Sequence, residues 1–323
     1  MRTLLAALLV ATVGPAFAAD SDFNGRWDIT TVQPQPRAWW VGLTGVGTAS
    51  PAGQFVTAYG GDMNTITTIT VENGELRFTI VPPARRGGRE TQTGNEPQLG
   101  ASIYRARLVN GKLEGTFERE GQTGPPLKWT GVRAPVIAET DDGAWKEGKP
   151  IALFNGKDLS GWQPLHPETK MKWSVVDGIL RNAPPTTDIF TTRKFWNFKL
   201  HVDFRIIHNS NSGIGLRGRY EIQIQDDYGK PLNSHMSGAL YSRVTPSVNA
   251  CKPAGEWQSY DIRLVGRQLT VVYNGIKIID KAEVEGLTAI AENSDEGEPG
   301  PFILQGDHSY VEIKNFVVTP LTR

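Results

Sequence analysis

Polar side chains alternate along the run "YEIQIQDDYG", residues 220–229, where Glu221, Gln223 and Gln225 occupy every second position. Alternate residues of a β-strand point to the same face, so these groups would form one polar row. A carboxylate can take up or deliver a proton, whereas an amide only donates and accepts hydrogen bonds. Chemistry on this face would therefore depend on Glu221, with the amides binding the reacting molecule.

The same row also has a purely structural interpretation. The preceding run "NSGIGLRGR", residues 211–219, keeps a compatible alternation if the strand continues through Gly218. Arg217 and Arg219 would then lie on the same face as Glu221. A carboxylate next to arginines on a sheet face is most often a solvated cross-strand ion pair, and the strand by itself favours that interpretation.

The elements that must position this row are β-strands. Asn-Gly or Asp-Gly pairs lie between strand-forming residues in several runs, a strong hairpin signal because type I′ turns need positive φ at both central positions. These runs are "VENGEL" (71–76), "LVNGKL" (108–113), "VVDGIL" (175–180) and "VYNGIK" (272–277). Residues 197–206 alternate between apolar and polar side chains, and residues 259–280 predict three further strands. We predict an all-β protein whose main part is a jelly-roll sandwich with one outer face free for the polar row.

The chain begins with one arginine, an apolar run too short to span a bilayer, and the small residues "AFAAD". This pattern predicts a signal peptide over residues 1–19, cut near Ala18 or Ala19, and hence a periplasmic or secreted protein. The formal net charge is zero and the sequence has no long basic run, so we expect neither nucleic acid nor a membrane surface as partner. Cys251 is the single cysteine, which excludes an intramolecular disulfide.

A stretch rich in proline, glycine and acidic residues, 132–149, predicts a linker between two domains. Before it lies a predicted small β domain, residues 20–131, with a long loop at residues 83–100 that has no apolar periodicity. After it lies the predicted jelly-roll domain, residues 150–323. The polar row therefore belongs to the second domain.

Runs along this second domain resemble the 3-keto-disaccharide hydrolase family. They are "IALFNGKDLSGW" (151–162), "WSVVDGIL" (173–180), "NSGIGLRGRYEIQIQDDYG" (211–229), "GALYSRVTP" (238–246), "KPAGEWQSYDIRLVGRQLTVVYNG" (252–275) and "GPFILQGDHSYVEIKNFVVTPL" (300–321). The resemblance implies a concanavalin A-like jelly roll, export to the bacterial envelope, and action on glycosides already oxidised to a ketone at sugar C3. Ser309 departs from the pattern, since the family resemblance leads us to expect glycine after His308, and this change affects the last loop.

A ketone at C3 would allow cleavage by elimination. It acidifies the hydrogen on C2, and the glycosidic oxygen on C1 then lies β to the resulting carbanion. Water added afterwards gives net hydrolysis. Ordinary glycosidases instead place two carboxylates around an oxocarbenium-like transition state. An elimination site needs a base near C2, donors for the enolate oxygen on C3, and an acid for the departing oxygen.

The family motifs contain residues that suit these roles. Glu221 and His308 are the candidate catalytic pair, with the base and the acid left unassigned. Arg217, Gln223 and Lys252 are candidate donors for the enolate, while Asp227 or Asp307 could orient the histidine or bind an ion. The predicted substrate-binding residues are Arg217, Gln223, Asp227, Lys252 and Gln305.

Two other function classes remain open at this stage. A non-catalytic carbohydrate-binding module of lectin type would use the same polar row to hold a sugar, with a tryptophan stacked on the ring. The tryptophans available for stacking are Trp162, Trp173, Trp196 and Trp257, although aromatic residues of β proteins more often lie in the core. A conventional retaining glycosidase is disfavoured because Glu221 is followed on its face by two amides.

We predict no required cofactor and no zinc site, because the remaining histidines lack metal-ligand spacing. A calcium ion could bind weakly at Asp226 and Asp227 or along residues 292–300. Cys251 is disfavoured as a nucleophile. The expected partners are the carbohydrate substrate and, functionally, a separate dehydrogenase that supplies the ketone.

Overall fold

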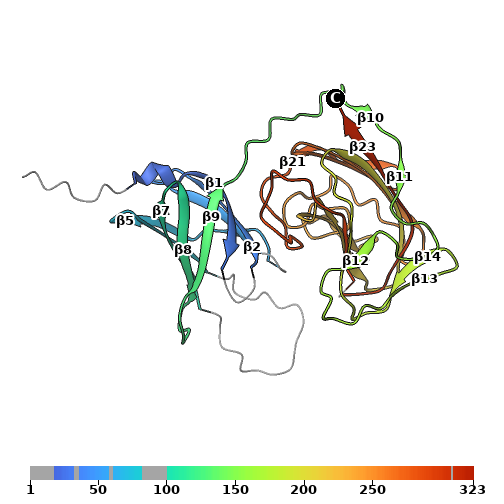
Figure 1. Cartoon of the computed structure of the whole chain (residues 1–323), viewed down its shortest axis with the longest axis horizontal. Coiled ribbons are helices and arrows are strands. Elements are labelled where there is room, and N and C mark those ends of the chain that lie inside the picture. Colours follow the sequence, from blue (N-terminus) through green and yellow to red (C-terminus); the bar gives the residue numbers. More distant parts are fainter. Residues whose placement is uncertain (1–17, 33–35, 58–60, 82–99, 307) are drawn as a thin grey trace, which may run out of the picture.

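The computed structural model describes residues 18–32, 36–57, 61–81, 100–306 and 308–323. Nearly all of the predicted signal peptide and of the predicted loop 83–100 lies outside these residues, as does Asp307. Within the described residues, strands dominate, and the one helical element is a 3-10 turn, η1 (Asp20–Phe23). Figure 1 shows two β units side by side, connected by an extended segment. The all-β prediction is confirmed.

The N-terminal unit is a single curled antiparallel sheet in the order β4-β3-β2-β1-β9-β8-β7-β6-β5. Its strands are β1 (Gly25–Thr31), β2 (Ala38–Thr44), β3 (Ala52–Thr57), β4 (Asn64–Thr65), β5 (Thr68–Glu72), β6 (Glu75–Ile80), β7 (Ser102–Val109), β8 (Lys112–Arg119) and β9 (Leu127–Arg133). Aromatic side chains fill the concave side, where the rings of Phe78 and Tyr104 stack with centroids 4.6 Å apart. Curling lets one sheet enclose its own core.

The second unit contains two sheets. The larger runs β13-β14-β23-β16-β19-β20-β21, with two short strands, β10 and β11, also paired to β23. The smaller runs β12-β15-β22-β17-β18. Their bounds are β10 (Lys146–Glu147), β11 (Ile151–Ala152), β12 (Trp162–Pro164), β13 (Trp173–Val176), β14 (Ile179–Asn182), β15 (Ile189–Thr191), β16 (Phe198–Ile206), β17 (Asn211–Leu216), β18 (Tyr220–Gln225), β19 (Gln258–Val265), β20 (Gln268–Tyr273), β21 (Ile276–Glu283), β22 (Ile303–Leu304) and β23 (Val311–Thr322).

The two sheets form a sandwich because their apolar faces share one core. Alternate residues of β16, from Phe198 to Ile206, are at most 1% exposed, as the alternation predicted. Ile214, Ile222 and Ile224 of the smaller sheet belong to the same hydrophobic cluster. The polar residues between them therefore face outward, away from the core.

The predicted hairpin turns are confirmed by their backbone angles. Both central residues have positive φ at each predicted site: Asn73-Gly74, Asn110-Gly111, Asp177-Gly178 and Asn274-Gly275. One further hairpin corrects the sequence-based interpretation. Arg217 and Gly218 also have positive φ, 52° and 66°, and Leu216 pairs with Tyr220. The strand therefore does not continue through Gly218, and the alternation breaks before Arg217.

The predicted linker is laid against the second unit by specific contacts. Its first residues still belong to β9. Asp141 forms a bidentate ion pair with Arg263, with N–O distances of 2.7 and 2.8 Å. The Trp196 indole donates to Glu139 over 3.0 Å. This stretch therefore fixes where the second unit begins relative to the first.

The two units also pack directly against each other. Trp40 of β2 forms a small buried apolar cluster with Leu287 and Ala291 from a loop of the second unit. Arg26 forms an ion pair with Glu285 at the same boundary. Burial of Trp40, which is 1% exposed, makes this a fixed contact.

An acidic pair is buried at this boundary. Asp28 is 4% exposed and lies close to Glu296, which is fully buried and forms an ion pair with Arg267. Burial, followed by the charge of Glu296, raises the pKa of Asp28 to about 9. Glu296 lies in the acidic run considered for calcium, and the structure uses its carboxylate in this ion pair instead.

Candidate functional site

The carboxylate of Glu221 lies flat on the outer face of the smaller sheet. It can do so because its diagonal neighbour on β17, two residues from its strand partner Gly215, is Gly213, where an added Cβ would stand 2.5 Å from Glu221 Oε1. Glu221 is 3% exposed. We call the outer surface around Gly213, bounded by Glu221, Gln223 and Gln305, the glycine trough. The trough ends at Gly215, because the space above this residue is occupied: a Cβ there would meet Ile303 at 3.0 Å and Ile290 at 3.3 Å.

Two amide side chains flank the glycine trough. Gln223 pairs with Gly213 across β17 and β18, and the Gln305 N–H donates to the Gly213 carbonyl over 3.0 Å. The side-chain oxygens of both glutamines are buried and accept no hydrogen bond from any described residue. Buried polar atoms are normally paired, so two unpaired acceptors beside one carboxylate indicate a place for a ligand with hydroxyl donors.

A chain of amide hydrogen bonds supports Gln223. Its Nε2 donates to Gln225 Oε1 over 3.2 Å, and Gln225 Nε2 donates to Asp227 Oδ1 over 3.3 Å. Asp227 is 3% exposed and also accepts from the Ser237 N–H at 2.9 Å. With its donor committed to Gln225, Gln223 keeps its oxygen available for the ligand. Asp227 thus fixes the orientation of the amide row.

His308 follows β22 on a short loop anchored on both sides. The Gly306 N–H donates to Asp188 over 2.7 Å, and the carbonyls of Gly306 and Ser309 both accept from Asn182. His308 itself is exposed. Gln305 of the trough precedes His308 by three positions in the chain. Ser309, the departure from the family pattern, contributes its carbonyl to this anchor.

Arg217 is placed away from the trough, contrary to its predicted role. Its guanidinium donates to the carbonyls of Trp196 and Gly266, at 2.7 and 2.8 Å, and to the Asn197 side chain at 3.2 Å. Burial lowers the pKa of Arg217 to about 10, and it is 1% exposed. The hairpin at Arg217-Gly218 causes this, because it turns the side chain toward the sheet boundary instead of along the polar row.

Lys252 is also committed elsewhere. Its ammonium donates to the Trp257 carbonyl over 3.1 Å, on the loop before β19. The tryptophans have structural positions as well: Trp162 and Trp173 lie in the core, Trp196 stacks under Arg217, and Trp257 lies under Arg205. The described contacts therefore assign these aromatic rings to packing.

Tyr241 is a site residue that the sequence analysis missed. Its N–H donates to the Glu221 carbonyl over 3.0 Å, which places its backbone at the free edge of β18, while the preceding Leu240 lies in the core. Burial, with the charges of Asp62 and Glu221, raises the pKa of Tyr241 above its ordinary value. The run "GALYSRVTP" contained it, and pairing of that run with β18 would have been the signal.

Among the described residues, no group of three histidine, cysteine, aspartate or glutamate side chains could hold a metal ion. Asp226 lies 2.8 Å from His208, and Asp227 is used in the amide chain. Cys251 is buried, and burial raises the pKa of its thiol. Calcium binding stays a prediction. No helix within the described part of the chain is long and apolar enough to cross a membrane.

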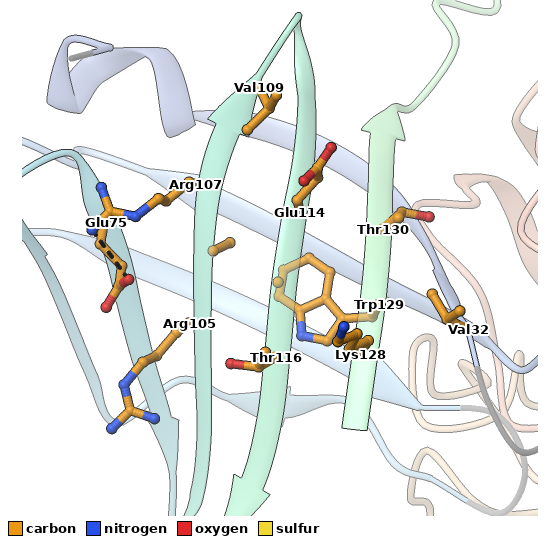
Figure 2. A pocket seen from close by; sticks show the side chains of 12 residues that line it. Val32, Glu75, Arg105, Arg107, Val109, Glu114, Thr116, Lys128, Trp129 and Thr130 are labelled. Atoms are coloured by element: carbon orange, nitrogen blue, oxygen red, sulfur yellow. Dashed lines mark ion pairs between the residues drawn. The ribbon is translucent and has the colours of Figure 1, made fainter. Parts of the chain in front are cut away.

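A hollow of about 380 Å³ lies elsewhere, on β6 to β9 of the N-terminal unit. Figure 2 shows its lining, in which Arg105 and Arg107 project from one strand and Glu75 faces Arg107. Glu75 and Arg107 form an ion pair at 3.3 Å, and the Trp129 ring is 1% exposed. Its two arginines form ion pairs, Arg105 with Glu118 and Arg107 with Glu75, and its aromatic ring is covered, so we assign no chemistry to it.

Residues 149–319 match the family model of the 3-keto-alpha-glucoside-1,2-lyase-like domain, which covers more than half of the chain. The chain belongs to this family. The predicted resemblance is thereby confirmed. Every residue of the glycine trough, together with His308, lies inside the matched range, whereas Asp28, Trp40 and Asp62 lie outside it.

The individual relatives have a low sequence identity to this chain. A 3-keto-disaccharide hydrolase of Bacteroides thetaiotaomicron is 23% identical over 148 residues, which are 35% of this chain and 51% of the relative. The chain thus spans about half the length of this curated relative. A Parabacteroides distasonis structure, provisionally named a glycosyl hydrolase, is 27% identical, with a TM-score of 0.47, covering 61% of this chain and 94% of that one. The endo-beta-1,3(4)-glucanase SCLam is 13% identical, with a TM-score of 0.36, covering 57% and 93%.

Proposed function

We propose that this protein cleaves glycosides that carry a ketone at C3 of the sugar. Family membership supports the substrate class. The observation that carries the proposal is the glycine trough, in which a buried carboxylate lies beside two buried amide oxygens that lack a described partner. A sugar ring in the trough would place its hydroxyl groups against these oxygens and one C–H bond against Glu221.

In the proposed reaction, Glu221 is the base. Its carboxylate takes the proton from C2, and the electron pair of that C–H bond forms the enolate with the C3 oxygen. The enolate then expels the oxygen on C1, which leaves a C1=C2 double bond conjugated with the restored ketone. Water adds across this bond, with hydroxyl to C1 and a proton to C2, so that the sum is hydrolysis.

His308 is proposed as the acid for the departing oxygen. It is exposed and follows Gln305 by three positions, and the proposal requires its imidazole to reach the leaving sugar or alcohol. An unperturbed imidazole titrates near neutral pH, so it can deliver a proton and recover it from water. Arg217 donates its hydrogen bonds to backbone carbonyls, so it does not serve the C3 oxygen. We assign the donor for that oxygen to the side-chain NH₂ group of Gln305.

The proposal also includes where the protein works and how its 3-keto substrate is formed. The N-terminal leader predicts a periplasmic or secreted enzyme. The ketone at C3 must be introduced by a separate dehydrogenase, since oxidation of a secondary alcohol needs an electron acceptor. No step assigned here requires a metal ion.

A carbohydrate-binding module is the second candidate. The unpaired oxygens of Gln223 and Gln305 would also suit an intact sugar that is held without reaction. The position of the carboxylate separates the two functions. A lectin has no need for a buried acid against the ring, whereas an elimination does.

A paired assay tests the proposal. The protein is incubated with a 3-keto glucoside bearing a chromogenic leaving group and, separately, with the unoxidised glucoside, and background elimination is subtracted. We expect release from the keto substrate alone, abolished in Glu221→Gln and strongly reduced in His308→Ala. Absence of release from both compounds, combined with saturable binding of the unoxidised sugar, would establish the binding module instead.

A further inference from the structure

The N-terminal unit reaches the second unit beside the glycine trough. The Met63 N–H donates to Ser242 Oγ over 2.9 Å, and Asp62 Oδ1 lies 3.0 Å from His235 Nε2. Ser242 is the residue after Tyr241, whose N–H donates to the Glu221 carbonyl. The Met63–Ser242 contact is therefore one residue away from Tyr241, whose backbone pairs with β18 at Glu221.

Tyr241 connects Asp62 to the trough. The Asp62 carboxylate bonds His235, and the His235 ring packs edge-on against the Tyr241 ring with centroids 4.9 Å apart. Asp62 thus holds the tyrosine through the histidine, and its charge also acts on the Tyr241 hydroxyl. A tyrosine ring has two side-chain torsions, so packing against its edge restricts its direction.

The approach of Asp62 is braced by the apolar cluster at the boundary. Arg243 bonds the Leu287 carbonyl, contacts the Met63 sulfur and lies over the Trp40 ring at 5.5 Å. Trp40 is 1% exposed and Arg243 is half-buried. This packing keeps Met63, and with it Asp62, against the strand segment that carries Tyr241.

The position of this contact limits the length of the trough. β18 is the last strand of the smaller sheet, and residues 239–241 pair with its free edge. Beyond those residues lies the N-terminal unit, at Asp62 and Met63. A sugar chain that crosses the strands from β22 toward β18 would therefore meet Asp62 and Met63 of the N-terminal unit. A sugar chain that runs along β17 toward Gly215 would meet Ile290.

We propose that Asp62 is a positioning residue that holds Tyr241 against the edge of the glycine trough, so that the N-terminal unit closes the site and only a terminal sugar residue can enter. This inference rests on the proposed function for its substrate.

Kinetics of matched variants test the positioning role. The variants are Asp62→Ala, Asp62→Asn and Tyr241→Phe, and the control is Arg26→Gln, which removes a boundary ion pair outside the Tyr241 contact. For Asp62→Ala, which loses its hydrogen bond to His235, we expect KM for the chromogenic 3-keto glucoside to rise about fivefold, the free energy of one hydrogen bond, with kcat changed less. Tyr241→Phe keeps the ring packing and should raise KM less than Asp62→Ala does. Asp62→Asn, which keeps one acceptor oxygen, should fall between Asp62→Ala and the wild type, and the control should match the wild type.

Hydrogen exchange provides a readout that does not need activity. We expect the backbone amides of residues 235–244 to exchange faster in Asp62→Ala than in Arg26→Gln. Equal exchange and equal KM in these two variants would overturn the positioning role while leaving the proposed function intact. A wild-type protein without activity would refute the proposed function, and the exchange comparison would still decide whether Asp62 orders the Tyr241 segment.

Two oligosaccharides test whether the N-terminal unit closes the glycine trough at Tyr241. One carries the 3-keto group on its terminal residue and the other on an internal residue, and product release is followed for both. We expect cleavage of the terminal ketone at least tenfold faster. Equal rates would overturn the closed site, because the internal residue would then have crossed the position of Tyr241.

Discussion

Substitution Gly213→Ala should reduce turnover by displacing the proposed base while leaving the fold in place. The new Cβ would stand 2.5 Å from Glu221 Oε1 and 3.0 Å from its Cγ, whereas ordinary contacts begin at 3.4 Å. The carboxylate must therefore move by about 0.9 Å. Misplacement of a catalytic group by about 1 Å can cost about 100-fold in rate, so we expect kcat to fall by about that factor.

The assay compares kcat for release of a chromogenic aglycone from the 3-keto glucoside with Tm from calorimetry. Gly215→Ala is the matched control, since it lies two residues away on the same strand and face. Gly215 is the strand partner of Glu221, but the atoms nearest to its Cβ would belong to apolar Ile303 and Ile290. We expect the control to lose about 1 kcal/mol of stability through overpacking, with a much smaller loss of kcat. A folded Gly213→Ala protein with wild-type kcat would refute the assignment of Glu221 as the base.

Three further predictions concern Asp28, Arg217 and Gln223. The folded protein raises the pKa of Asp28 from 3.8 to about 9 and so retains a proton that the unfolded chain has lost; the free energy of unfolding should fall as pH rises from about 4 to about 9. Asp28→Asn should flatten this decline in Tm-against-pH scans, and an equally steep decline in the variant would contradict the assignment. Arg217→Met should cost about 2–4 kcal/mol in denaturant unfolding, because the carbonyls of Trp196 and Gly266 lose their buried donor, yet leave kcat of the folded protein unchanged. A large kcat loss there would restore Arg217 to the site. Gln223→Leu should raise KM about tenfold through loss of the buried acceptor, and an unchanged KM would show that the oxygen contacts no substrate.

The parts of the fold that sequence predicted are those with local causes. Asn73-Gly74 and Asn274-Gly275 form the predicted hairpins because those residue types tolerate positive φ at low cost. The alternation of residues 197–206 became β16 with its apolar side in the core, since a period of two can bury only one face. The same rule placed Glu221 and Gln223 together on an outer face.

The missed features depend on contacts between distant segments. Arg217 adopts φ of 52°, which is uncommon for a residue with a side chain, and its guanidinium bonds to Trp196 and Gly266 compensate for that cost. Local sequence carries no sign of those carbonyls. Likewise, Asp62 and His235 meet across 173 positions of sequence, and only packing of the two units brings them together.

The structure brings part of the predicted residue set together in space. Glu221, Gln223 and Gln305 do meet around Gly213, the first two by strand alternation and the third because β22 pairs with β17. Lys252 was grouped with them through the family motif alone, and its ammonium bonds the Trp257 carbonyl instead. Motif membership identified the right strands, whereas side-chain direction required the structure.

The most direct test of the central claim is the fate of the hydrogen on C2. The enzyme cleaves a 3-keto glucoside in D₂O, and the released sugar is analysed by NMR and mass spectrometry, with enzyme-free substrate and product incubated alongside to subtract spontaneous exchange. Elimination followed by hydration predicts one deuterium at C2 of the released sugar, formed at the rate of cleavage and absent with Glu221→Gln. A released sugar that retains its original hydrogen at C2 would contradict proton abstraction by Glu221 and indicate direct displacement at C1.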